Sequence, residues 1–114
     1  MNTEPRPQLA NGLRWVRGEL EQSITRARTL IEQHVENGGD PLPLQQAFVE
    51  LHQVRGTSTM IQCHGAAALA EEMKAALQDL MHGRVAEAEP LYAALLGSTI
   101  QLTDYLLALS DGTE

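Results

Sequence analysis

The stretch VELHQVRGTSTMIQ, residues 49–62, combines a helical pattern of apolar residues with an unusual group of polar ones. Together with the residues before it, this stretch places apolar or small side chains at Leu44, Phe48, Leu51, Ser58 and Ile61. Spacings of three, four and seven are typical of one face of an α-helix rather than of a strand. Gly56 lies inside this predicted helix, where glycine costs about 1 kcal/mol relative to alanine, so its presence calls for a reason.

The same helical period continues on both sides of this stretch. A segment before it, expected to end at the glycines and proline of residues 37–41, has apolar residues at Leu13, Val16, Leu20, Ile24, Ala27 and Ile31. A segment after a turn expected around His64-Gly65 has them at Ala66, Leu69, Ala70, Met73, Leu77 and Leu80. A last segment, expected from Pro90, has Leu91, Leu95, Ser98, Leu102, Tyr105 and Leu109 on one face.

Four helical segments joined by short connections predict an all-α fold, an up-down-up-down antiparallel four-helix bundle. A length of 114 residues suits one such domain. Residues 1–12, with two prolines and Asn11-Gly12, are expected to be a flexible lead-in. The bundle is expected to span residues 13–110, and residues 111–114 are expected to be a flexible tail.

The amino-acid composition indicates which kinds of partner and which cellular location the chain favours. The chain is 43% hydrophobic but only 4% aromatic, and 8 Lys and Arg against 15 Asp and Glu give a net charge of −7. This charge disfavours nucleic acid and anionic membrane surfaces as partners. Residues 1–12 have neither the basic start nor the apolar run of a signal peptide, and no later segment approaches the roughly 18 uninterrupted apolar residues needed to span a bilayer, so no direct membrane insertion is expected. The single cysteine, Cys63, cannot form an internal disulfide, and a cytoplasmic location is expected.

The polar residues of the opening stretch share one stripe of their helix. At 100° per residue, Arg55 lies about 60° to one side of His52, Gly56 about 40° to the other, and Thr59 about 20° away, two turns further along. Leu51 and Phe48 face inward, which places His52 near the boundary with solvent. Such a position suits a nucleophile or a ligand. In the alternative interpretation, His52 is an ordinary surface histidine and Gly56 a point of close helix contact.

The functional interpretation explains the stripe as a site for a phosphoryl group. A neutral imidazole is a competent nucleophile. Gly56 would leave space beside the ring for a bulky group or for the active site of another protein. Arg55 would supply a permanent positive charge to a phosphoryl group that carries about −1.5 to −2.

The motif HQVRGT, residues 52–57, resembles the signature of histidine phosphotransfer (HPt) domains, which are four-helix bundles. The longer stretches LRWVRGELEQSITRARTLIEQHVEN, LHQVRGT and GAAALAEEMKAAL are similar to the N-terminal HPt-like region of the ChpA/PilL sensor kinases of type IV pilus chemosensory systems, and to that of FimL proteins. The resemblance covers residues 13–109.

By this resemblance, His52 would be the phosphoacceptor of a two-component phosphorelay that controls twitching motility, and Arg55, Gly56 and Thr59 would form the phosphoryl and partner surface. The partner would be a response-regulator receiver domain or the kinase module of the same system, and the receiver would supply Mg²⁺. The chain would need no cofactor and would be a phosphocarrier without catalytic activity of its own, or part of a histidine kinase in a longer chain.

An alternative follows from the same resemblance. FimL-like relatives have another residue at the acceptor position and act as interaction modules. The chain would then be a non-phosphorylated docking domain for a FimL-like or other pilus-regulatory protein. A bundle that serves only for oligomerisation or as a spacer would leave the His52 stripe unexplained.

The other reactive residues favour structural roles. The histidines are not spaced as metal ligands, so no metal site is expected, and Cys63 is interpreted as a small core residue. Glu71, Glu72 and Lys74 are expected on a mostly solvated face. Trp15 is expected to close one end of the bundle, with an exposed partner contact as the alternative. Gly18 and Gly97 are expected where helices approach closely, with a bend at Gly97 as the alternative.

Overall fold

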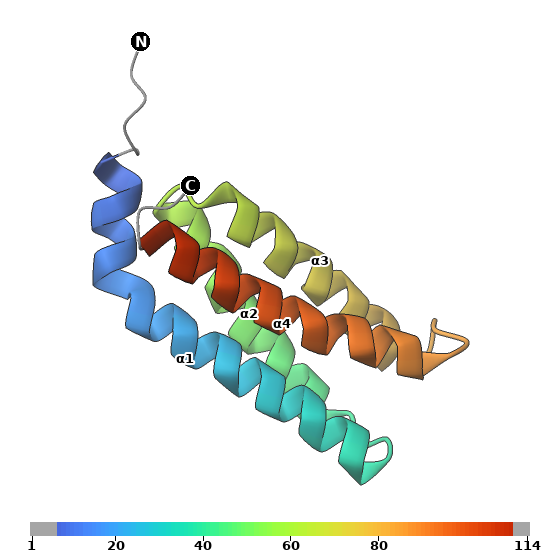
Figure 1. Cartoon of the computed structure of the whole chain (residues 1–114). Helices are drawn as coiled ribbons and strands as arrows, with labels where there is room; N and C mark the ends of the chain where they lie inside the picture. The colour runs from blue at the N-terminus through green and yellow to red at the C-terminus, as the bar shows by residue number, and fades with distance from the viewer. Residues whose placement is uncertain (1–6, 111–114) are drawn as a thin grey trace.

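The computed structural model describes residues 7–110, with the side chains of residues 12–109. This part of the chain forms four α-helices and no strand (Figure 1): α1 (Pro7–Asn37), α2 (Leu42–Met60), α3 (His64–Met81) and α4 (Ala88–Ser110). The predicted all-α class and the number of helices are therefore confirmed for the described residues.

Each helix packs against two of the others. Among the described residues, α1 and α3 both pack against α2 and α4, while neither α1 and α3 nor α2 and α4 make close backbone contacts. Figure 1 shows the α1–α2 and α3–α4 connections at one end of the bundle, and the α2–α3 connection at the other end, near the C-terminal end of α4. The core lies between the helices, and α2 packs directly beside α3.

The core is built from the apolar positions that follow the helical period. In α1 and α2 the buried apolar side chains are Leu13, Leu20, Ile24, Ala27, Ile31, Leu44, Ala47, Leu51 and Val54. In α3 they are Ala66, Ala70, Met73 and Leu77. Burial of these apolar side chains is the main favourable contribution to folding, at roughly 25 cal/mol per Å² removed from water. Leu51 and Val54, both fully buried, fix which side of α2 faces solvent.

The inner face of α4 differs from the predicted one. Thr99 and Leu106 are fully buried, whereas Tyr105, predicted to face inward, remains 38% exposed. The Thr99 hydroxyl donates to the Leu96 carbonyl at 2.6 Å, so its polar group is satisfied within the helix. Apolar residues occupy most positions of α4, so their spacing alone specifies its rotation poorly.

The first helix begins before the predicted boundary at residue 13. α1 starts at Pro7, so residues 7–12, which we expected to be flexible, are helical. Gly12 lies directly against α2's C-terminal end, because a Cβ atom at this position would come within 2.6 Å of Ile61 Cγ2. The other expected flexible segments, 1–6 and 111–114, lie outside the described residues.

Two glycines of α1 provide a matched test of this packing. Gly12→Ala is expected to lower the free energy of unfolding by about 1–2 kcal/mol, because the overlap with Ile61 outweighs the gain in helix propensity. Gly18→Ala is expected to raise it by up to about 1 kcal/mol, since nothing lies within 4 Å of a Cβ there. Urea unfolding of both variants measures the difference. Equal effects of the two substitutions would contradict the close contact of Gly12.

The connection between α2 and α3 falls at residues 61–63, earlier than the predicted turn at His64-Gly65. Gln62 adopts a left-handed conformation with a φ of 64°. The Cys63 amide donates to the Ser58 carbonyl at 2.7 Å, which closes the end of α2. Gly65 lies in the first turn of α3 and makes room for Tyr105, whose hydroxyl oxygen would lie 2.6 Å from a Cβ at this position.

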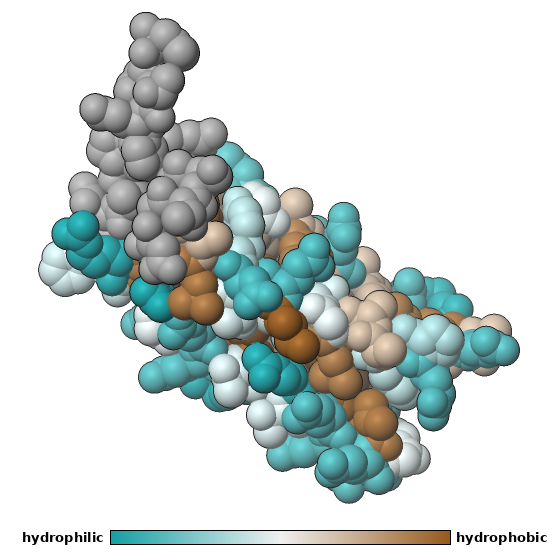
Figure 2. Space-filling view, viewed as in Figure 1, coloured by the Kyte–Doolittle hydropathy of each residue, from teal (hydrophilic) through white to brown (hydrophobic). Residues whose placement is uncertain are grey.

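The surface carries several exposed apolar side chains. Figure 2 shows a diagonal band of apolar surface on the face where α1 and α4 lie. Trp15 on α1 is 85% exposed, so the prediction that it closes the bundle end is wrong. Within residues 7–110, no helix combines the length and apolar character that crossing a membrane requires.

Candidate functional site

His52 lies on the exposed side of α2 and faces α3. Its neighbour Leu51 is fully buried, and the one-residue step around the helix carries the imidazole of His52 out to the solvent boundary. The ring is therefore exposed, which is the position that the helical period predicts.

Lys74 of α3 is the closest polar neighbour of this imidazole. Its ammonium nitrogen lies 3.0 Å from His52 Nδ1. The lysine is only 8% exposed, and its ammonium lies 5.2 Å from the centre of the Phe48 ring, within the range of a cation–π contact. The expectation that Lys74 lies on a mostly solvated face is wrong. Its stem packs along the core while its charged end reaches the imidazole.

Glu71 joins the two cations beside His52. Its Oε1 atom lies 2.9 Å from Arg55 Nε and 3.4 Å from Lys74 Nζ. Both Arg55 and Glu71 are substantially exposed, and exposed ion pairs of this kind contribute about 0–1 kcal/mol to stability. The main consequence is geometric, because the pairs hold Arg55 of α2 and Lys74 of α3 on the same flank of the imidazole.

The opposite flank of His52 is open. A Cβ atom at Gly56 would meet nothing within 4 Å, so the alternative that this glycine is a close helix contact is wrong. Thr59, the remaining member of the predicted stripe, is exposed, and its hydroxyl donates to the Arg55 carbonyl at 2.8 Å. The structure thus brings the predicted residues to one surface, with the cations on one side and free space on the other.

Two apolar residues of α2 border the open flank. Val49 and Met60 are 56% and 77% exposed. At 100° per residue they lie about 60° and 80° around the helix from His52, on the same side as Gly56. Val49 lies about one turn before His52 and Met60 about one turn after Gly56, so the two side chains flank this side of α2 at separate points.

His34, by contrast, has a structural role. It is buried at the end of α1, where Nδ1 donates to the Asp40 carbonyl at 2.7 Å. Its other nitrogen, Nε2, lies 2.8 Å from the Tyr92 hydroxyl. The residue joins α1, the α1–α2 connection and α4. The histidine spacing in the sequence gives no sign of this role.

Cys63 behaves as the predicted core residue. It is buried, and burial is the main influence that raises the pKa of its thiol, partly offset by hydrogen bonds from the Ala66 backbone and Tyr105. The thiol is thus kept protonated and poorly nucleophilic near neutral pH. Among the described residues, His, Cys, Asp and Glu side chains do not form any group of three or more that could hold a metal ion.

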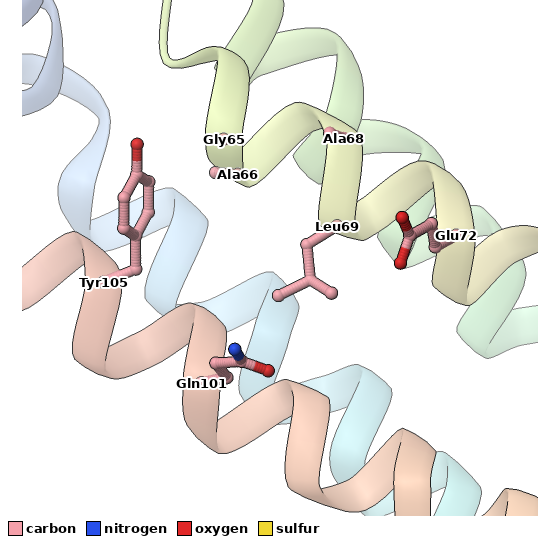
Figure 3. Close-up of a pocket in the computed structure, with 7 residues that line it drawn as sticks. All are labelled: Gly65, Ala66, Ala68, Leu69, Glu72, Gln101 and Tyr105. Atoms are coloured by element: carbon pink, nitrogen blue, oxygen red, sulfur yellow. The ribbon is translucent and has the colours of Figure 1, made fainter.

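A shallow pocket lies on the other side of α3. Figure 3 shows its lining between α3 and α4, formed by Gly65, Ala66, Ala68, Leu69, Glu72, Gln101 and Tyr105. Leu69 points into the space between the two helices, and Glu72 lies at one end of it (Figure 3). None of these residues contributes to the surroundings of His52 described above, so the pocket is separate from the candidate site.

Comparisons with protein-family models, with curated proteins and with solved structures give no match.

Proposed function

We propose that the chain is an HPt-like phosphotransfer module, an up-down-up-down antiparallel bundle in which His52 accepts a phosphoryl group from, or donates it to, an aspartate of a receiver domain. The observation that carries the proposal is the exposed imidazole, with open space at Gly56 on one side and the Lys74 and Arg55 cations on the other. An enzyme that acts alone would need further catalytic groups, which the proposed carrier does not require.

The proposed reaction is an in-line displacement. The lone pair of Nε2 forms a bond to phosphorus while the bond from phosphorus to the aspartate oxygen breaks, and the carboxylate leaves. The receiver supplies Mg²⁺ and the acidic pocket. This chain contributes the nucleophile and the positive charges of Lys74 and Arg55, which favour the approach of a group that carries about −1.5 to −2.

The open flank supports the approach of a partner protein. The absence of a side chain at Gly56 leaves room for the rim of a partner's active site, and Val49 and Met60 offer apolar contact area next to it. Thr59 lies two turns further along α2, about 20° from His52 on the Arg55 side, and adds a hydroxyl group to the exposed stripe. In the proposal, docking depends on this apolar border, and transfer depends on His52.

The sequence resemblance supplies the proposed biology. The chain would act in the cytoplasm, in the two-component chemosensory system that controls type IV pili and twitching motility. Its partner would be a receiver domain or the kinase module of that system. In a longer chain the module would be one domain of a histidine kinase.

A phosphotransfer assay tests the proposal. The purified chain is mixed with a phosphorylated receiver, or with the kinase and ATP, from the same signalling system. We expect an acid-labile, alkali-stable label that mass spectrometry locates on His52. The proposal would be contradicted by label on another residue, or by no label from a donor that phosphorylates a second, known acceptor in the same experiment.

One contact favours a second candidate function, a docking domain that is not phosphorylated. The Lys74 ammonium is directed at Nδ1 of His52, where it stabilises a ring with a hydrogen-bond donor, rather than a lone pair, on the outward nitrogen. Such a ring suits the recognition of an acidic partner. This function makes two requirements. A FimL-like or other regulatory partner must bind the unphosphorylated chain, and a confirmed donor must transfer no phosphate to it.

A further inference from the structure

The contact between Lys74 and His52 determines which nitrogen of the ring carries the proton. An ammonium group has only donors, so the 3.0 Å contact requires His52 Nδ1 to accept. In the neutral ring, one nitrogen is an acceptor and the other carries the hydrogen. The hydrogen of a neutral His52 is therefore on Nε2, the nitrogen that points away from Lys74.

Two other histidines of the chain have the opposite arrangement. His34 Nδ1 lies 2.7 Å from the Asp40 carbonyl, and His82 Nδ1 lies 2.8 Å from the Gln78 carbonyl. A carbonyl oxygen only accepts, so Nδ1 carries the hydrogen in both rings. Within one chain, His52 thus differs from His34 and His82 because its Nδ1 faces a cation.

The position of Lys74 makes this arrangement persistent. The lysine is 8% exposed, its stem is packed in the bundle, and its ammonium lies 5.2 Å from the centre of the Phe48 ring. Glu71 lies 3.4 Å from the same nitrogen and stabilises its positive charge. These contacts hold the ammonium beside Nδ1, whereas the Arg55 guanidinium is directed to the Glu71 carboxylate.

We infer that Lys74 is a positioning residue that holds neutral His52 with its proton on Nε2, so that the resting site presents a hydrogen-bond donor to an acidic group of the partner. The inference rests on the proposed function in taking His52 as the residue that meets the partner. The group recognised is a carboxylate or phosphoryl oxygen, which accepts from Nε2–H and is attracted by both nearby cations.

The arrangement adds a step before transfer. Nε2 becomes a nucleophile only after it has released its proton to solvent and Nδ1 has taken one up from solvent, which requires Lys74 to leave Nδ1. The Nε2 lone pair then forms the bond to phosphorus as the bond to the donor carboxylate breaks. The incoming phosphoryl oxygens are the natural new partners of the Lys74 ammonium, so arrival of the substrate itself favours the change.

Nitrogen NMR of the ¹⁵N-histidine-labelled chain tests the inference at about pH 8.5, where histidine side chains are ordinarily neutral. We expect His52 to show a bare Nδ1 and a protonated Nε2, and His34 to show the reverse and serve as an internal reference. The His52 signals are assigned by their loss in His52→Gln. A protonated Nδ1 on His52 in the unmodified chain would overturn the inference.

Variants sharpen the test. Lys74→Glu replaces the donor with an acceptor and is expected to move the His52 proton to Nδ1, while Arg55→Met, the matched loss of the other cation, is expected to leave it on Nε2. A folded Lys74→Glu chain that keeps the proton on Nε2 would overturn the inference. The spectrum of the unmodified chain decides the matter even if this variant does not fold.

The labelling assay separates this inference from the proposed function. A chain with the proton on Nε2 that receives no phosphate would support the role of Lys74 and contradict phosphotransfer. A chain that is phosphorylated on His52 but carries its resting proton on Nδ1 would support phosphotransfer and overturn the role of Lys74.

Discussion

Replacing His52 by glutamine is expected to abolish phosphoryl labelling of the chain while leaving its fold intact. Glutamine retains a polar, exposed side chain but has no nucleophilic nitrogen, because its amide lone pair is delocalised. His52 is exposed, so its loss removes little buried surface, and the thermal midpoint is expected to change little. The measurement is the amount of acid-labile label after transfer from a phosphorylated receiver, with circular dichroism as the check of folding.

His64→Gln is the matched control for this prediction. His64 is also an exposed histidine, at the first position of α3, and it lies outside the described surroundings of His52. The control variant is expected to be labelled like the unmodified chain. Label that persists in His52→Gln would exclude His52 as the acceptor and would favour the docking function.

Replacing Gly56 by leucine is expected to reduce the rate of phosphoryl transfer by about 100-fold, because misplacing reacting groups by only about 1 Å has effects of this size. The new side chain would occupy the open flank of His52, where a Cβ meets nothing within 4 Å in the present structure. Stability is expected to rise by up to about 1 kcal/mol, since leucine favours the helix more than glycine. Transfer kinetics and urea unfolding together distinguish a steric block from misfolding.

Gly97→Leu provides the control for this substitution. Gly97 is an exposed glycine within α4, where an added Cβ atom would likewise meet nothing within 4 Å. It belongs to a different helix from the α2 and α3 residues that surround His52. This variant is expected to gain similar stability and to transfer at the unmodified rate. Normal transfer by a folded Gly56→Leu chain would show that partners do not approach over this flank.

Much of the helical organisation could be predicted from residue spacing, because the buried core residues recur every three or four positions along their helices. Leu51 and Ser58 face inward as predicted, although α2 also carries apolar side chains on its exposed side, at Val49 and Met60. The start of α1 could not be predicted, because prolines and Asn-Gly usually indicate a loop, whereas here Gly12 allows the helix to pack against Ile61. In α4 the many apolar residues leave the rotation ambiguous.

The candidate site could be predicted only where it lies within one helix. The positions of His52, Arg55 and Gly56 on α2 follow from the 100° step between residues. The contact of His52 with Lys74 depends on how α3 packs beside α2, which the sequence does not show. One sign was present in the sequence: Lys74 follows Ala70 by four residues and Met73 by one, so it lies close to the buried face of α3. The expectation of close helix contacts at Gly18 and Gly97 is wrong, because a glycine in a sequence does not reveal whether its surroundings are crowded or empty.

The carboxylate shared by Arg55 and Lys74 has a consequence for how long a partner stays bound. Arg55 and Lys74 are cations and Glu71 is an anion, so before phosphorylation this group of side chains carries one net positive charge and attracts an acidic partner. A covalently held phosphoryl group would add about −1.5 to −2 and reverse the sign. The phosphorylated site would then repel the same acidic partner, so that completion of the reaction would itself promote dissociation of the complex.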